Sequence, residues 1–297
     1  MTYILYNPKS YNAHGKQDAE KALETMKEKG KFNPDKIEFI NIIEKKDIID
    51  FVNSLSENDT VIICGGDGTL NHFANDLYSA KITADKIKCA LKFLPCGSGN
   101  DFMHDTANVP LPEHLFEPIE IKQYLMNLPA VTVNGKTQYF VNGIGFGIDG
   151  YCCEEGDKIR ATSDKPINYT AIAIKGLLFK FKPCGAKVTV DGKSYTFKKV
   201  WLAPTMKGRF YGGGMMVAPD QNRLAEDRQV SLVVLHGSGK LRTLVVFPSI
   251  FTGHHVEHKD MISIFKGQHI AVEFTKPCAL QIDGETVPNV LKYSVSI

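Results

Sequence analysis

The sequence has no long apolar run. Its first residues, MTYILYNPKS, contain only four consecutive apolar residues before a polar turn. This is too short for the apolar core of a signal peptide, and no later stretch approaches the roughly 20 residues that cross a bilayer. We therefore expect neither a signal peptide nor a membrane-spanning helix, and we expect a cytoplasmic protein.

Cysteine pairs with the spacing of metal ligands are also missing. The seven cysteines form no C-x-x-C pair and are odd in number, which favours neither a disulfide framework nor a zinc site. We expect free thiols, several of them buried. They lie at positions 64, 89, 96, 152, 153, 184 and 278.

An excess of charge of one sign is missing as well. The 35 basic and 33 acidic residues leave a formal net charge of +2, which is too small to create a field that attracts nucleic acid. Nucleic acid is therefore not an expected partner, and any anionic ligand must be bound locally. With 43% hydrophobic and 23% charged residues, the composition is that of a globular protein with a substantial core.

Strand-like and helix-like segments alternate over the first third of the chain. This alternation predicts a parallel sheet with helices on its faces. The predicted strands are 3–6, 37–43, 60–64 and 90–94, and the predicted helices are 16–29, 47–55 and 69–80. We therefore expect an open, Rossmann-like α/β domain over residues 1–125 that binds a nucleotide.

After residue 125 the pattern changes to short apolar runs bounded by turn dipeptides. Asn134-Gly135 and Asp191-Gly192 each separate two such runs, and both dipeptides are strong hairpin signals because they tolerate positive φ. We expect a β-rich, β-sandwich-like domain over residues 126–297, with the proline-rich segment 104–130 as the linker region. Further strands are expected at 215–218, 230–235, 269–274 and 279–282, with one helix at 167–181.

A glycine-rich loop, GGDGT at 65–69, joins the strand 60–64 to the following helix. Glycines leave no Cβ to hold a ligand away from the main chain, and N–H groups at the start of a helix bind phosphate oxygens. Asp67 would repel a phosphate unless Mg²⁺ lies between them or the carboxylate accepts a hydroxyl proton. The loop therefore indicates chemistry on a metal-bound nucleotide, although read alone it is also compatible with a simple tight turn.

A second glycine-rich loop, PCGSGNDF at 95–102, follows the strand 90–94 and again carries an acid. Because the carboxyl ends of parallel strands meet at one edge of the sheet, the two loops should converge there, where this architecture binds ligands. Neither loop matches the dinucleotide pattern G-x-G-x-x-G or the Walker pattern.

These motifs together resemble the diacylglycerol kinase catalytic family, which includes the bacterial soluble lipid kinases and the sphingosine kinases. The resemblance rests on GGDGT with the following Leu70-Asn71, and on GSGNDF at 97–102. Three further segments extend it in family order over nearly the whole chain. They are NPKS at 7–10, GGGM at 212–215 with Ala218-Pro219, and DGE at 283–285.

The resemblance implies a lipid kinase that transfers the γ-phosphate of ATP to a lipid hydroxyl. Diacylglycerol, giving phosphatidic acid, is the first expected acceptor, with phosphatidylglycerol and sphingoid bases behind it. ATP and Mg²⁺ would be the cofactors. The partner would be a lipid substrate at the membrane surface, so the protein would associate transiently with the inner face of the membrane. A homodimer is also possible, and the sequence does not decide the oligomeric state.

The resemblance also assigns roles to residues. Asp283 would be the general base with Glu285 in support, although Asp283-Gly284 alone predicts a hairpin turn. Asp67 would be the competing base, weighted toward orienting Mg²⁺. The metal ligands would be Asp67, Asp101 and Asp283. The nucleotide would be bound by Asn7, Pro8, Ser10, Gly65, Gly66, Asp67, Gly68, Thr69, Asn71, Gly97, Ser98, Gly99 and Asn100.

Several positions depart from the family pattern. His72 replaces a usual Glu, His104 replaces a common Arg, and no acid occurs between Glu120 and Asp149, where the family often has an Asp. The turn EDRQVS at 226–231 lacks the glycine and the last acid of a second, structural Mg²⁺ site, so we do not expect that site. The departures keep open a nucleotide- or lipid-binding protein that has lost catalysis. NAD kinase, which shares GGDGT, is the other alternative.

Two weaker signals remain. His254, His255 and His258 cluster with Glu257 and could ligate a metal, but a solvated or cleft-lining loop is favoured. The segment 172–182, IAIKGLLFKFK, mixes apolar residues with lysines as a helix resting on a membrane would, but core packing with a rim of lysines is favoured.

Overall fold

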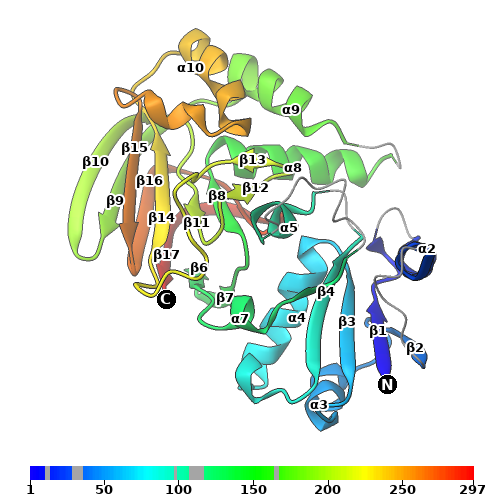
Figure 1. Ribbon diagram of the computed structural model, residues 1–297. Helices are drawn as coiled ribbons and strands as arrows, with labels where there is room; N and C mark the ends of the chain where they lie inside the picture. Colours follow the sequence, from blue (N-terminus) through cyan, green and yellow to red (C-terminus); the bar gives the residue numbers. More distant parts are fainter. Residues whose placement is uncertain (11–13, 29–35, 97–98, 107–116, 164–166) are drawn as a thin grey trace. The chain divides into compact units, whose positions relative to one another are not determined.

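The computed structural model describes residues 1–10, 14–28, 36–96, 99–106, 117–163 and 167–297 (Figure 1). The chain divides into two compact units, Met1–Leu128 and Pro129–Ile297. Within the described ranges, no helix has the length and apolar character needed to cross a membrane. The seven cysteines are free, and Cys64 and Cys89 are buried, which confirms the expectation from the sequence.

The first unit is built on a five-stranded sheet with the strand order β2-β1-β3-β4-β5. Four of its strands are parallel, and they confirm the predicted α/β alternation. Residues 61–64 of the central strand are apolar and almost completely buried, as a parallel strand covered on both faces requires. The strands are β1 (Thr2–Tyr6), β2 (Ile37–Asn41), β3 (Thr60–Gly65), β4 (Ala90–Pro95) and β5 (Ile119–Glu120).

Helices connect these strands at the predicted places. Helix α2 packs Ala19, Ala22 and Leu23 against Ile4 and Ile62 of the sheet, as the spacing of these residues predicts. Gly30, expected to end this helix, lies outside the described residues. The helices are α2 (Gly15–Glu28), α3 (Ile48–Ser54), α4 (Asp67–Ser79), η1 (Ala84–Lys86), α5 (Asp101–Thr106) and α7 (Lys122–Leu125).

The boundary between the two units lies after Leu128, within the segment 104–130 expected to hold the linker, but most of the described part of this segment is structured. Strand β5 pairs antiparallel with β4, and α7 places Leu125 in the core. The Lys122 Nζ donates a hydrogen bond to the Ile87 carbonyl at 2.6 Å. Pro118 directly precedes β5 and Pro129 directly precedes β6 (Ala130–Val133), at strand ends where proline is tolerated.

The second unit is an antiparallel β structure built around the long strand β16. Residues 270–274 of β16 pair with β9, whereas residues 280–282 pair with β8, so the strand changes its partner along its length. Phe146 and Phe274 stack at 4.0 Å within the core. This architecture confirms the β-rich domain.

The strands of this unit include two segments that the sequence divided or extended wrongly. The expected strands 269–274 and 279–282 form one strand with bulges between Glu273 and Leu280, and the expected strand 215–218 is limited to two residues. The strands are β6 (Ala130–Val133), β7 (Lys136–Tyr139), β8 (Gly143–Phe146), β9 (Cys184–Val190), β10 (Lys193–Val200), β11 (Thr205–Met206), β12 (Phe210–Tyr211), β13 (Met215–Met216), β14 (Val230–Leu235), β15 (Ile262–Gly267), β16 (His269–Ile282) and β17 (Glu285–Ser296).

Both predicted hairpins are confirmed. Asn134-Gly135 joins β6 to β7, and Asp191-Gly192 joins β9 to β10, with positive φ at all four residues. This geometry matches the twist of the flanking strands.

Helix α8 (Ile148–Arg160) was not predicted. It lies against β16 through Gly150, where a Cβ would come within 1.9 Å of the Ala279 carbonyl oxygen. A helix that packs through glycine has no apolar stripe to reveal it. The predicted helix 167–181 corresponds to α9 (Tyr169–Lys175) and the π-helical turn η2 (Gly176–Lys180), and the remaining helices are α10 (Lys240–Val246), η3 (Phe247–Phe251) and η4 (His254–Glu257).

Candidate active site

The two glycine-rich loops of the first unit converge, as the sequence predicts. Asp67 is the first residue of α4, and its carboxylate accepts hydrogen bonds from the backbone N–H groups of Asp101 and Phe102 at 2.9 and 3.0 Å. The Cys96 N–H donates to the Gly65 carbonyl at 2.8 Å. Asp67 therefore joins the start of α4 to the start of α5, and its oxygens retain lone pairs for a further ligand.

Thr69 links the glycine loop to the first strand. Its Oγ1 accepts a hydrogen bond from Asn7 Nδ2 at 2.9 Å and lies 3.5 Å from Ser10 Oγ. The Lys9 N–H in turn donates to Asn7 Oδ1, which holds the turn that contains Pro8. Residues after β1 and β3 thus form one polar cluster at the carboxyl ends of these strands, where this architecture binds ligands.

Two glycines of this loop differ in what surrounds them. A Cβ on Gly65 would lie 2.5 Å from Thr69 Oγ1, whereas a Cβ on Gly68 would meet no atom within 4 Å. Packing therefore requires glycine at position 65 but not at position 68. Open space beside the Gly68 main chain, at the start of α4, is suited to the close approach of an anionic ligand.

Gly65→Ala should destabilise the protein by about 1–3 kcal/mol, because Thr69 is buried on a helix and cannot move away from the new methyl group. Gly68→Ala is the matched control. Its stability should stay within about 0.5 kcal/mol of wild type, while its affinity for ATP should fall. Urea unfolding and ATP titration measure the two effects, and equal stability losses would contradict the assignment.

The second loop is described only in part, because Gly97 and Ser98 lie outside the described residues. Asn100 has a φ of 52° and is buried, and Asp101 is buried in the first turn of α5. An acid there interacts favourably with the helix dipole. Gly99 precedes these residues in the loop, and Asn71 lies on α4, where its carbonyl and Oδ1 accept hydrogen bonds from Asn75.

Asp283 is the candidate catalytic acid of the second unit. It has a φ of 44° and Gly284 a φ of 93°, so the pair makes the two-residue turn between β16 and β17. Its carboxylate accepts hydrogen bonds from three consecutive backbone N–H groups, those of Val141, Asn142 and Gly143, the last two at 2.9 and 2.8 Å. The hairpin turn and the positioned carboxylate are therefore one feature. Three such bonds hold the carboxylate in one orientation and stabilise its negative charge.

Arg223 supports the loop 141–143 from the other side, and the sequence did not reveal it. Its buried guanidinium donates to the Val141 carbonyl and to Asn142 Oδ1, both at 2.5 Å. The same loop thus gives its N–H groups to Asp283 and receives the guanidinium of Arg223. Arg223 lies in the turn after Ala218-Pro219. None of the family motifs includes Arg223 itself.

Protein hydrogen bonds close the turn after Ala-Pro. Gln221 Nε2 donates to the Gln229 carbonyl at 2.9 Å, and the Ser231 hydroxyl donates to Gln221 Oε1 at 2.6 Å. Ser231 stands where the last acid of the family's second Mg²⁺ site would be. This position therefore carries a hydroxyl bonded to Gln221 in place of a carboxylate.

A buried lysine adds positive charge next to this loop. The Lys207 backbone N–H donates to the Asn142 carbonyl, and the side chain is 3% exposed. Burial, followed by the neighbouring charges of Arg223 and Arg228, lowers the pKa of Lys207 to about 8. Lys207 is therefore largely but not completely protonated near neutral pH.

Asp149 is a buried acid that the sequence did not single out. It follows β8 in the first turn of α8, and a Cβ on Gly145 would lie 2.6 Å from its Cβ and 2.8 Å from Gln281 Nε2. Burial raises the pKa of Asp149 to about 7, and the nearby Tyr211 hydroxyl opposes this shift. Within the described chain, neither Asp149 Oδ2 nor the Tyr211 hydroxyl meets hydrogen-bond geometry with any partner. The strand, glycine turn and helix around Asp149 repeat the pattern of the two loops of the first unit. This repeated pattern is the signal by which the sequence could have indicated Asp149.

The raised pKa of Asp149 predicts a pH dependence of stability. The folded state holds this proton up to pH about 7, whereas the unfolded state releases it near 3.8, so stability should fall as pH rises through this window. Between pH 5 and pH 8 the free energy of unfolding of the wild type should decrease, and in Asp149→Asn this decrease should be smaller by about 2 kcal/mol. Urea unfolding of both proteins at the two pH values measures this difference. Equal decreases in the free energy of unfolding would refute a contribution of buried Asp149 to the pH dependence.

The structure also describes Glu285, His104 and the histidine cluster at 254–258, which the sequence analysis had named. Glu285 is exposed at the start of β17. His104 is half-buried, and burial lowers its pKa although Asp67 opposes the shift. His255 bonds the Val217 carbonyl at 3.0 Å while His254 pairs with Glu257 at 2.9 Å, so the histidine cluster does not converge. Across the residues that the structure describes, no three His, Cys, Asp or Glu side chains are grouped to hold a metal.

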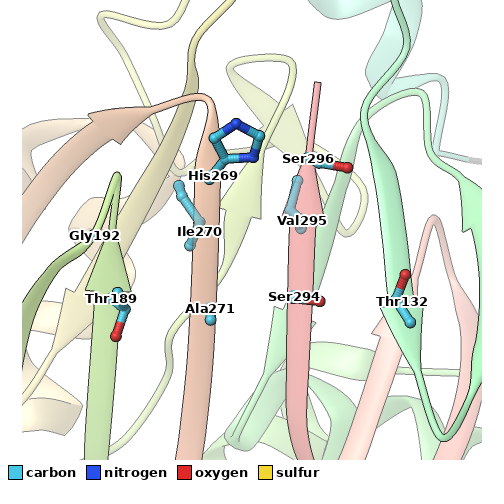
Figure 2. Close-up of a pocket in the computed structure, with 9 residues that line it drawn as sticks. All are labelled: Thr132, Thr189, Gly192, His269, Ile270, Ala271, Ser294, Val295 and Ser296. Atoms are coloured by element: carbon cyan, nitrogen blue, oxygen red, sulfur yellow. The ribbon is translucent and has the colours of Figure 1, made fainter.

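A hollow in the second unit lies apart from these residues (Figure 2). It crosses β6, β9, β16 and β17, and its lining residues are glycine, alanine, serines and threonines together with Ile270, Val295 and His269, with no acid among them. None of the predicted site residues lines it, so we do not regard it as the active site.

Comparison with known proteins defines the class. The diacylglycerol kinase catalytic domain matches residues 1–125, and the YegS C-terminal NAD kinase beta sandwich-like domain matches residues 142–294. The chain therefore belongs to the diacylglycerol kinase catalytic family of lipid kinases, with a YegS-type C-terminal domain. This confirms the resemblance drawn from the motifs.

Individual relatives are distant. A diacylglycerol kinase of Mycobacterium tuberculosis is 23% identical over 218 residues, which are 72% of this chain and 67% of that protein. The Shewanella frigidimarina protein named "Probable lipid kinase YegS-like" is 24% identical over 258 residues, 82% of this chain and 76% of its own. The crystal structure of a diacylglycerol kinase from Bacillus anthracis is 18% identical, with a TM-score of 0.57 over 99% of this chain and 92% of that chain. At this identity it supports the fold alone.

Proposed function

We propose that the protein is an ATP- and Mg²⁺-dependent kinase that phosphorylates the free hydroxyl of diacylglycerol to give phosphatidic acid. The observation that carries the proposal is the Asp283 carboxylate held by three consecutive N–H groups, in a chain of this family. The family supports a lipid hydroxyl as acceptor, and the M. tuberculosis relative favours diacylglycerol among lipids.

The first unit would bind ATP. The open space beside Gly68 would receive phosphate oxygens, and the cluster of Asn7, Ser10 and Thr69 would contact the nucleotide at the ends of β1 and β3. Phosphates bound at the start of a helix also gain from its dipole.

The residues present fit a Mg²⁺ ion that arrives with the nucleotide. Mg²⁺ typically binds one or two carboxylates together with substrate phosphates, and it would supply charge neutralisation on the transferred group. Asp67 has lone pairs available beside the start of α5, and Asp101 is its neighbour there.

In the second unit, Asp283 would accept the proton of the lipid hydroxyl. As the hydroxyl oxygen bonds to the γ-phosphorus, the bond from phosphorus to the β,γ-bridging oxygen breaks and ADP leaves. The proton passes to the Asp283 carboxylate. The hydrogen bonds from the loop 141–143 would keep this carboxylate oriented during the step, and Glu285 would add negative charge nearby.

Transfer of labelled γ-phosphate from ATP, with Mg²⁺, to diacylglycerol, phosphatidylglycerol, sphingosine and undecaprenol in mixed micelles tests the proposal. We expect labelled phosphatidic acid. Label on another lipid would replace the acceptor but keep the class. Binding of NAD without lipid-dependent ATP turnover would support NAD kinase, and ATP binding without transfer to any lipid would support a protein that has lost catalysis.

A further inference from the structure

Two short elements of the second unit expose apolar side chains beside one another. Helix α10 and the turn η2 are in contact, and the Lys240 Nζ donates a hydrogen bond to the Leu178 carbonyl at 2.9 Å. Figure 1 shows α10 next to α9, which leads directly into η2. The two elements therefore form one continuous surface.

This surface carries the three most exposed large apolar side chains of the described residues. Val245 is 78% exposed, Leu241 76% and Phe179 72%. Leu241 and Val245 lie one helical turn apart and so share a face of α10, while Thr243 and Val246 are buried. Ile174 on α9 is also exposed. Among the residues that the structure describes, the surface is thus an exposed apolar face of the second unit.

Core packing explains only the other side of the segment 172–182. Ala173, Leu177 and Phe181 belong to the buried cluster that contains Trp201. The interpretation favoured from the sequence therefore accounts for these residues. It leaves Ile174 and Phe179 unexplained, because they face away from the core.

Positive charge surrounds the apolar face. Lys175, Lys180, Lys182 and Lys240 are exposed, and residues 167–182 and 238–256 contain no Asp or Glu. Arg242, the remaining cation, is paired with Asp260. Four exposed lysines therefore accompany the apolar face, and the acid that contacts α10, Asp260, is neutralised by Arg242. Such a face complements a surface of anionic lipid headgroups.

We propose that Ile174, Phe179, Leu241 and Val245, with the four surrounding lysines, form a docking surface for an anionic membrane. The apolar side chains enter the boundary between headgroups and acyl chains, and the lysines contact lipid phosphates. The inference rests on the proposed function, since a lipid kinase must take its acceptor from a bilayer. A second copy of the chain fits less well, because a two-fold contact would place lysines against lysines.

Sedimentation with vesicles of phosphatidylcholine and phosphatidylglycerol, compared with phosphatidylcholine alone, tests the surface. The variant Phe179→Ser/Leu241→Ser/Val245→Ser should bind the mixed vesicles at least about tenfold more weakly than wild type. Replacing Lys175, Lys180 and Lys182 with Glu should lower the affinity for the mixed vesicles about 100-fold and remove the preference for anionic vesicles. The matched control Ile264→Ser/Leu291→Ser changes two exposed apolar residues on strands β15 and β17 and should bind like wild type.

Two further measurements separate the outcomes. Wild-type binding by the apolar variant would overturn the inference, and if light scattering showed that this variant had become monomeric, the surface would be a dimer interface instead. Phosphorylation of a short-chain diacylglycerol dissolved as monomers should be unchanged in the variant. Vesicle binding through this surface without any lipid kinase activity would defeat the proposed function alone. Activity on the dissolved lipid without vesicle binding by wild type would defeat the docking inference alone.

Discussion

Asp283→Asn is expected to lower kcat about 10³-fold, because it removes the proposed proton acceptor. Asparagine tolerates the positive φ of this turn, and its Oδ1 still accepts the hydrogen bonds of Asn142 and Gly143, while the bond from Val141 is lost. The variant should therefore fold and bind ATP normally. Labelled phosphate transfer measures kcat, and circular dichroism and ATP titration confirm that the fold and the nucleotide site are retained.

Two companion variants make this result decisive. Glu285→Gln should lower kcat far less than Asp283→Asn does, because Glu285 is exposed. Asp67→Asn should weaken binding of ATP with Mg²⁺ together with activity, because the Asp67 carboxylate holds the start of α5. If Asp67→Asn abolished transfer with unchanged ATP affinity while Asp283→Asn stayed active, Asp67 would be the base.

Arg223→Met should lower kcat by about 10- to 100-fold and destabilise the fold by about 2–4 kcal/mol, because it removes two hydrogen bonds to the loop that positions Asp283. Arg223 acts on the reaction through this loop, so the KM for ATP should not change. Arg223→Lys keeps the charge and one donor, and it should restore part of kcat. The kinetics with the dissolved lipid and urea unfolding provide both readouts.

The control for Arg223→Met is Arg160→Met. Arg160 is exposed on α8, where it pairs with Asp157, and its loss should leave kcat and stability near wild type. A fall of stability in Arg223→Met with unchanged kcat per folded molecule would show that Arg223 is structural only.

The sequence predicted those parts of the fold that are encoded locally. The alternation of the first unit and the hairpins at Asn134-Gly135 and Asp191-Gly192 follow from periodicity and from residues that tolerate positive φ. The elements that it missed are encoded by tertiary packing. Helix α8 packs through Gly150, and the proline-rich segment before residue 130 adds a strand to the sheet.

The site follows the same division. Motif positions such as Asp67 and Thr69 could be named from the chain, because a strand, a glycine turn and a helix are contiguous in sequence. Arg223 could not, since it contacts residues 81 and 82 positions earlier. Asp149 follows the same local pattern as Asp67, but its burial beside Gly145 and Gln281 depends on the tertiary structure.

By itself, the sequence determined the family, the order of its motifs and the two domain types, and it supplied the acids proposed for phosphoryl transfer, because residue type and local spacing carry this information. Only the tertiary structure decided which groups hold Asp283, that burial raises the pKa of Asp149, and that Phe179, Leu241 and Val245 face solvent beside four lysines. Burial and hydrogen-bond geometry depend on segments far apart in the chain, and no local pattern contains them.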